Sequence, residues 1–177
     1  MVSFQEKLKR AGFFFLPLLP LHVGVMSASA ADRLSSTRTD DGIVISFPNG
    51  QKARLESSRG LLGPLSNPQS QVPLTNKEGT LVAVNEQPET KTSILHLYLK
   101  GKNGLYVEIK NAQGIIKGLQ PRGAVTDFIR ANRISSAKGG LINIELQLQS
   151  AESEKYFPSG VTLNTRTGQI FVPEGGD

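Results

Sequence analysis

The stretch LINIELQLQ at residues 141–149 constrains the fold of this chain more than any other feature. Ile142, Ile144, Leu146 and Leu148 alternate there with polar side chains. Because successive side chains of a strand point to opposite faces, this alternation predicts a strand with one buried face and one face in water. A sheet with one apolar face must cover that face with another layer, so the sequence predicts a packed β-domain.

Shorter stretches with the same alternation recur along the chain, each bounded by turn residues. They lie at residues 43–47, 53–55, 80–84, 94–100, 104–110, 161–163 and 170–172. Asn49-Gly50, between the first two, is a strong hairpin signal. About eight or nine short strands without intervening helices predict an all-β fold, an antiparallel β-sandwich of the immunoglobulin-like kind. We expect it to form a single domain over residues 42–177.

The alternation also predicts which side chains face the core. In residues 104–110 it places Leu105, Val107 and Ile109 on the buried face and Tyr106 in water. Residues 123–133 are ambiguous, because apolar side chains there have helical spacing as well as an approximate alternation. A short helical turn near residues 124–132 and an extended segment both fit this stretch.

Two segments lack a strand pattern. Residues 31–41, ADRLSSTRTDD, are polar and without periodicity, which predicts a flexible leader. Residues 58–79 contain Pro64, Pro68 and Pro73, each of which removes a backbone donor and excludes a central strand. This second segment is expected to be a long loop that either crosses between the sheets or has a function of its own.

The N-terminus has the three parts of a secretory signal. The basic stretch KLKR at residues 7–10 precedes the apolar run AGFFFLPLLPLHVGVM, and the small residues ASA follow at 28–30. The run contains two prolines and is shorter than the roughly 20 apolar residues that span a bilayer. We therefore predict a cleaved signal peptide over residues 1–30 and export to the periplasm, the extracellular space or the cell surface. The chain has no Cys, so it must hold together without disulfides.

The sequence offers few candidates for catalysis. His96 is the single histidine after the signal, and its place in an alternating stretch predicts a partly buried strand histidine rather than a metal ligand or a triad member. Ser135 and Lys138 have the Ser-x-x-Lys spacing, but the partner motifs of that chemistry are missing. No dinucleotide or phosphate-loop motif occurs. We predict no enzyme activity, no cofactor and no metal site.

Charge is unevenly distributed. The segment 100–138 holds two acidic residues and eight basic ones, which are Lys100, Lys102, Lys110, Lys117, Arg122, Arg130, Arg133 and Lys138. Gathered on one face, these eight would attract a polyanion. Strand alternation favours the other interpretation, in which they are scattered over several edges and discourage edge-to-edge association.

The C-terminal stretch SGVTLNTRTGQIFV, residues 159–172, predicts a final hairpin in which Gly168 supplies a left-handed turn residue. The stretch resembles the ending of bacterial putative-immunoglobulin and cadherin-like domains. The resemblance covers only this end of the chain and implies a β-sandwich. It implies no calcium site, because the acidic linker motif of cadherins is missing.

Two functions fit these features. The first is an exported, non-catalytic β-sandwich that acts through protein–protein contacts in a bacterial envelope or surface assembly. The alternative is a binding module for an anionic glycan or a lipid headgroup, with the basic segment 100–138 as its surface. An exported location disfavours nucleic acid as the partner. No stretch after the signal is long and apolar enough to predict a transmembrane segment.

Overall fold

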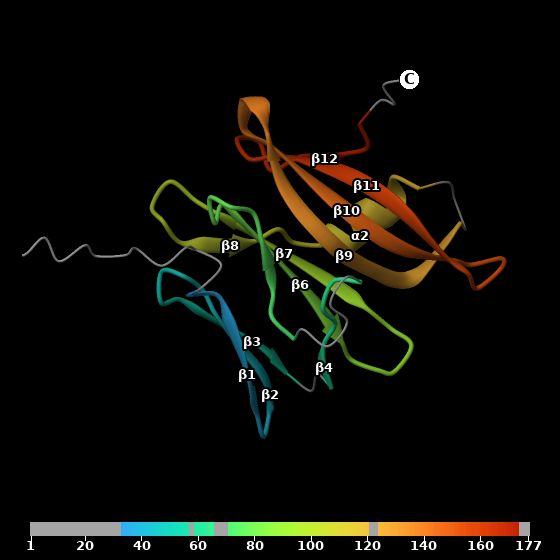
Figure 1. Cartoon of the computed structure of the whole chain (residues 1–177), viewed down its shortest axis with the longest axis horizontal. Helices are drawn as coiled ribbons and strands as arrows, with labels where there is room; N and C mark the ends of the chain where they lie inside the picture. Colours follow the sequence, from blue (N-terminus) through green and yellow to red (C-terminus); the bar gives the residue numbers. More distant parts are fainter. Residues whose placement is uncertain (1–32, 57–58, 66–70, 121–123, 174–177) are drawn as a thin grey trace, which may run out of the picture.

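The computed structural model describes residues 33–56, 59–65, 71–120 and 124–173. The signal peptide expected at residues 1–30 lies outside these described residues. The described part forms three antiparallel sheets and a short helix, which confirms the predicted all-β, sandwich-like class. Figure 1 shows the N-terminal sheet (blue to teal) and the C-terminal sheet (orange to red) on opposite sides of the central green strands.

The N-terminal sheet has the order β1-β2-β3, with strands β1 (Ser35–Thr39), β2 (Gly42–Ser46) and β3 (Lys52–Glu56). The predicted hairpin joins β2 to β3. The Gly50 amide donates to the Phe47 carbonyl at 2.9 Å, and Gly50 has a φ of 83°. This is the left-handed position that a three-residue hairpin loop requires.

Strand β1 corrects the expected flexible leader, because residues 35–39 pair with the whole of β2. Backbone hydrogen bonds place this strand, and such bonds need no apolar side chains, which explains why alternation does not reveal it. Leu34, just before β1, is buried. Gly42 ends the β1–β2 turn with a φ of 136°, and a Cβ there would lie 2.1 Å from the Leu55 carbonyl oxygen.

The central sheet has the order β4-β6-β7-β8, and β5 also pairs with β6. Its strands are β4 (Gly60–Leu61), β5 (Leu74–Thr75), β6 (Leu81–Gln87), β7 (Ile94–Lys100) and β8 (Tyr106–Glu108). The two-residue strands β4 and β5 lie within the segment expected to be a loop, residues 58–79. Strand β6 is buried on both faces, so it forms the middle of the molecule.

The C-terminal sheet has the order β12-β11-β10-β9. Its strands are β9 (Val125–Ala137), β10 (Leu141–Ser150), β11 (Tyr156–Asn164) and β12 (Ile170–Phe171). The alternation predicted for residues 141–149 is confirmed: every second residue of β10 from Ile142 to Leu148 is buried. The final hairpin is also confirmed, and Gly168 has the expected positive φ of 72°.

Strand β9 resolves the ambiguity of residues 123–133, where a helical turn was one alternative: the segment is extended. Two irregularities in its pairing with β10 explain the helical spacing. At the first, Arg133 pairs with Glu145 and Ala131 with Leu146, so Asn132 is an extra residue and the buried positions shift by one. A β-bulge of this kind changes the side-chain phase of a strand and imitates a different periodicity.

Helix α2 (Ala112–Gly118) follows β8 and carries two glycines, which lower its intrinsic helix propensity. Burial of Ala112 and Ile116 against the interior supports it instead. A Cβ on Gly114 would meet the side chain of Asn111 at 2.2 Å. Among the described residues, no helix has both the length and the apolar character needed to cross a membrane.

Two apolar clusters lie on the two faces of the central sheet. The inner core fills the space between the central and C-terminal sheets and consists of Leu81, Ala83, Leu95, Leu97, Ala112, Ile116, Val125, Ile129, Ala131, Ile134, Ile142, Ile144, Leu146, Leu148, Val161, Leu163 and Ile170. The outer cluster fills the space under the N-terminal sheet and consists of Leu34, Ile43, Ile45, Phe47, Leu55, Leu61, Val82, Val84, Tyr98 and Tyr106.

The outer cluster reverses the expected orientation of β8. Tyr106 is buried and stacks on Phe47 with ring centroids 4.7 Å apart, whereas Leu105 and Val107 are 51% and 61% exposed. Leu105 and Val107 flank Tyr106 at the edge of the sheet. The N-terminal sheet covers the opposite face, which carries Tyr106, so the residue expected in water is the buried one.

A buried amide ties the central sheet to β9. The Asn85 side chain donates to the Ala131 carbonyl at 2.8 Å and accepts from the Ala131 amide at 2.7 Å. The Asn85 side chain therefore satisfies the backbone amide and carbonyl of Ala131, as the backbone of a neighbouring strand would. Nearby, the Ile129 amide donates to the Ser93 carbonyl at 3.2 Å. These contacts close one side of the sandwich and fix how the two larger sheets meet.

Candidate functional site

The turns at one end of the sandwich border two neighbouring hollows. The larger, of about 560 Å³, is lined by Thr80, Leu99, Lys100, Gly101, Lys102, Thr165 and Arg166 and is called here the cationic cleft. The smaller, of about 290 Å³, is lined by Asn76, Glu78, Thr80, Ser136, Ala137, Gly140, Leu141 and Ile142 and is called the amide hollow. Thr80, the residue just before β6, lines both.

The turns that carry the charges of the cationic cleft are held by their own hydrogen bonds. In the β7–β8 turn, the Gly101 amide donates to the Leu105 carbonyl at 2.8 Å. In the β11–β12 turn, the Arg166 amide donates to Oδ1 of Asn164 at 3.0 Å. Lys102 and Arg166 thus project from two turns with defined backbones, one from each of the larger sheets.

The cationic cleft has a net positive charge. Lys100, Lys102 and Arg166 line it, and no carboxylate is among its described lining residues. None of the three forms an ion pair with a described carboxylate. The Lys100 ammonium lies 6.0 Å from the centroid of the Tyr106 ring, a weak cation–π contact.

The amide hollow is built around the buried side chain of Asn76. Its Oδ1 accepts from the amides of Thr80 and Leu81, both at 2.9 Å, and its Nδ2 donates to Ser136 Oγ and to Glu78 Oε2, both at 2.9 Å. The Ser136 hydroxyl donates to the same Glu78 oxygen. That hydrogen bond is the main cause that lowers the pKa of Glu78, so its carboxylate is an ionised acceptor at the surface of the hollow.

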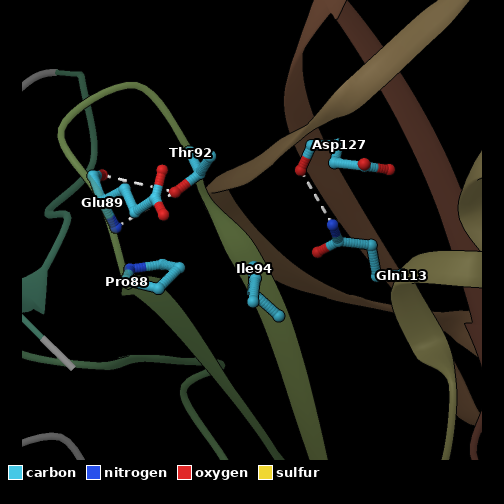
Figure 2. A pocket seen from close by; sticks show the side chains of 6 residues that line it. All are labelled: Pro88, Glu89, Thr92, Ile94, Gln113 and Asp127. Atoms are coloured by element: carbon cyan, nitrogen blue, oxygen red, sulfur yellow. Dashed lines mark hydrogen bonds between the residues drawn. The ribbon is translucent and has the colours of Figure 1, made fainter. Parts of the chain in front are cut away.

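A third hollow, of about 340 Å³, lies between the β6–β7 hairpin and β9 and is lined by Pro88, Glu89, Thr92, Ile94, Gln113 and Asp127. Figure 2 shows Glu89 and Asp127 on opposite sides of it, with Ile94 between them. Asp127 pairs with Lys117 at 2.6 Å. Gln113 accepts from the Leu95 amide and donates to the Asp127 carbonyl. Its two carboxylates make this hollow unsuitable for an anion.

The structure scatters most of the eight basic residues of segment 100–138. Lys117 and Arg133 pair with Asp127 and Glu145 respectively. Arg122 lies outside the described residues. Lys110 and Lys138 are exposed but line none of the three hollows. Of the basic residues of this segment that the structure describes, only Lys100 and Lys102 line the same hollow.

Arg130 behaves differently from the other basic residues, because it is only 7% exposed. Its guanidinium donates to the Gly63 carbonyl, and its Nε has no partner in the described structure. Burial lowers the pKa of Arg130. The residue therefore holds the chain after β4 against β9 and does not contribute to an exposed basic surface.

Sequence reasoning missed Arg166, which completes the cationic cleft from outside the basic segment. Arg166 lies more than 60 residues after Lys102, and only the meeting of two turns from different sheets brings them to one hollow. The predicted C-terminal hairpin was the one indication in the sequence, because turns lie at the surface and a basic residue in a turn is therefore exposed.

His96 is the partly buried strand histidine that the sequence predicts, with 20% of its side chain exposed. It lies between two carboxylates: Nε2 is 2.8 Å from Glu86 Oε2, and Nδ1 is 2.8 Å from Glu108 Oε1. Because the two ring nitrogens face opposite ways, the carboxylates do not converge with the ring on one point. Among the described residues, no three potential ligands form a group that could hold a metal ion.

Ser135 and Lys138 do not lie on a common α-helix. Ser135 belongs to β9, and Lys138 begins the 3₁₀ turn Lys138–Gly140. The Ser-x-x-Lys chemistry uses an α-helix, on which residues three apart are neighbours.

No family model, curated protein or solved structure matches this chain, so the proposals below rest on its own residues and geometry.

Proposed function

We propose that this chain is a non-catalytic binding module of an exported bacterial protein and that it holds an anionic group in the cationic cleft. One observation carries the proposal: Lys100, Lys102 and Arg166 line a single cleft without a carboxylate beside them. Unpaired like charges at close range repel one another, and a bound anion relieves that repulsion. The hydroxyl of Thr80 at the same cleft supplies a neutral hydrogen-bond donor.

The geometry supports a carboxylate, phosphate or sulfate as the bound group. Arg166 offers a planar fork of donors that matches two oxygens of such a group, and Lys102 adds a mobile point charge. The cleft is open to solvent, so its attraction for anions is screened by salt within about 10 Å at 0.1 M ionic strength. Binding should therefore weaken steeply as salt is added.

The test compares two doubly substituted proteins of equal charge. K102Q with R166Q removes two cations from the cleft, and K52Q with K110Q removes two exposed cations elsewhere. On a sulfated resin eluted with a salt gradient, the cleft variant should bind about tenfold more weakly than wild type at one salt concentration, because two charge-assisted contacts are lost. The control should elute with the wild type. Equal shifts of both variants would show non-specific attraction and would overturn the proposal.

Export is part of the same proposal and has its own test. The signal predicted at residues 1–30 supports it. Expressed in a bacterium with residues 1–30 present, the protein should be recovered outside the cytoplasm. Its mass should equal that of a chain that begins at Ala31. A cytoplasmic protein that retains its first 30 residues would contradict export.

A second candidate function, protein–protein contact in an envelope or surface assembly, is favoured by the exposed side chains of Leu105 and Val107. Exposed apolar side chains that form a contiguous patch mark docking surfaces, and residues two apart on a strand lie on the same face. Strand addition at this edge is blocked, since Gln51 accepts from the Tyr106 amide and donates to the Tyr106 carbonyl, both at 2.7 Å. A partner would therefore contact the side chains and not the backbone of β8.

Crosslinking in the native envelope tests this second function. If a protein partner docks on β8, L105S with V107S should abolish its capture, while V172S, which changes a similarly exposed residue away from β8, should leave capture unchanged. Thermal unfolding of the purified variants must match wild type for the comparison to be valid. Undiminished capture by the double variant would refute a contact at β8.

A further inference from the structure

The cationic cleft and the amide hollow adjoin each other, and the pair is called here the groove. Thr80 lines both. Thr165 of the cationic cleft donates to the carbonyl of Gly140, which lines the amide hollow, from both its amide at 2.9 Å and its hydroxyl at 2.7 Å. Together the two hollows have the size of small-molecule sites, which is on the order of 300–1,000 Å³. A ligand longer than a single anion can therefore occupy both.

The two ends of this groove have opposite chemistry. The cationic cleft offers Lys102 and Arg166. The amide hollow offers the ionised carboxylate of Glu78 and the hydroxyl of Ser136. Glu78 repels a second negative charge and accepts hydrogen bonds from neutral hydroxyl groups. The groove thus fits a ligand that is anionic at one end and rich in neutral hydroxyls at the other.

We propose that the groove binds an acidic oligosaccharide in which a charged sugar lies in the cationic cleft and a neutral sugar lies against Glu78 in the amide hollow. This inference rests on the proposed function, since it uses the same cationic cleft. Sugar rings supply several hydroxyl donors along an extended chain, which matches carboxylate and hydroxyl acceptors at fixed positions. A polymer charged at every unit would place an anion against Glu78, and a compact lipid headgroup would fill only the cationic cleft.

Calorimetric titration at low salt with four probes tests the inference. The probes are a hyaluronan oligosaccharide, in which acidic and neutral sugars alternate, an oligogalacturonate of equal length, which is acidic at every ring, inorganic sulfate, and vesicles that contain phosphatidylglycerol. Wild type should bind the alternating oligosaccharide about tenfold more tightly than sulfate, since the amide hollow adds hydrogen bonds to a charged acceptor. It should also prefer this oligosaccharide to oligogalacturonate.

The informative variant is E78Q, which keeps the size of the side chain and one acceptor oxygen but removes its charge. It should lose the preference for the alternating oligosaccharide over oligogalacturonate, because the repulsion of the second acidic ring is gone. Its affinity for sulfate should stay at the wild-type value. A purely structural role of Glu78 would change all probes alike and leave the preference intact, which would overturn the inference.

The remaining outcomes separate the two proposals. Sulfate binding that K102Q with R166Q abolishes, together with an oligosaccharide affinity no better than that of sulfate, would refute the oligosaccharide and keep the anion site. Binding of vesicles without binding of oligosaccharides would refute it as well. If neither sulfate nor any oligosaccharide binds, the anion site of the proposed function fails too.

Discussion

The inner core and the outer cluster lie on opposite faces of the same strands and are built in different ways. The buried members of the inner core are all aliphatic, and most of them come from long strands of the two larger sheets, with Ala112 and Ile116 added by helix α2. The outer cluster contains Phe47, whose ring contacts those of both Tyr98 and Tyr106, and it joins two sheets that share no strand pair in the described structure.

This difference shows two ways to attach one layer of β-structure to another. Between the larger sheets, interdigitated aliphatic side chains and the Asn85–Ala131 amide pair give a continuous interior. Under the N-terminal sheet, side chains make the connection in the described structure, including that of Gln51, which donates to the Tyr106 carbonyl and accepts from the Tyr106 amide, both at 2.7 Å. We therefore expect the N-terminal sheet to separate in a local opening before the inner core unfolds.

The largest effect is expected in the inner core. L148A should lower the free energy of unfolding by about 4 kcal/mol, because it removes a fully buried side chain and leaves a cavity among residues that cannot close over it. Denaturant unfolding followed by circular dichroism measures this change. The neighbouring substitution Q147A, on the other face of β10, should cost less than about 0.5 kcal/mol. Equal losses for the two would contradict the assigned faces of β10.

The next effect concerns the outer cluster. F47A should lower the free energy of opening of the N-terminal sheet by about 3 kcal/mol, since both ring contacts and the buried area of Phe47 are lost. Hydrogen exchange should then show reduced protection in β1–β3 and unchanged protection in β10. F47L, which keeps most of the apolar area, should lose less. A uniform loss of protection through all three sheets would show that the layers unfold as one unit.

A smaller effect is expected at the junction of the two larger sheets. N85A should lower the free energy of unfolding by about 2 kcal/mol, because it leaves the buried amide and carbonyl of Ala131 without partners. Q87A removes a solvent-exposed hydrogen bond of the same strand and is the matched control. Thermal unfolding measures both variants, and a control as destabilised as N85A would argue against a special role for the amide pair.

The smallest effect at neutral pH concerns Tyr98 in the outer cluster. Burial, reinforced by Glu108 and Glu86, raises the pKa of Tyr98 to about 12. The pKa of Tyr98 in the folded protein is above the unfolded value of about 10. The buried phenol therefore contributes fully to the free energy of unfolding below pH 10, and this contribution is lost as the pH rises towards 12.

Denaturant unfolding between neutral pH and pH 12 tests this expectation. Wild type should lose stability in that alkaline window, and Y98F should lose less of it. The appearance of tyrosinate absorbance gives an independent measure of the titration. If Y98F and wild type have the same alkaline profile, the buried phenol is not the cause.

Much of the fold could be predicted from the sequence where one face of a strand is buried and the other is wet. Strand β10 and the hairpin around Gly50 are such cases, since their patterns follow from the strand itself. Strand β9 could not be assigned, because the two irregularities in its pairing with β10, at Asn132 and between Val125 and Ile129, shift the phase of the buried residues. Strand β1 was not predicted, because its position depends on backbone pairing with β2 rather than on apolar side chains.

The candidate site was predictable only in part. Lys100 and Lys102 were among the expected anion-binding residues, but Arg130 was expected with them and is buried against Gly63. Arg166 could not be joined to them from sequence, since no local pattern states that the tips of two hairpins in different sheets meet. The amide hollow is equally non-local, because Asn76 and Ser136 are 60 residues apart.

By itself, the sequence determined that this chain is built largely of antiparallel strands with one apolar face, because side-chain direction along a strand is a local property of the backbone. Only the tertiary structure decided which faces are covered and which charges meet. The N-terminal sheet covers Tyr106, while Val107 on the other face of β8 stays in water. Two turns that are distant in the sequence line one cationic cleft. Burial and charge density are properties of the assembled layers, so no single segment carries them.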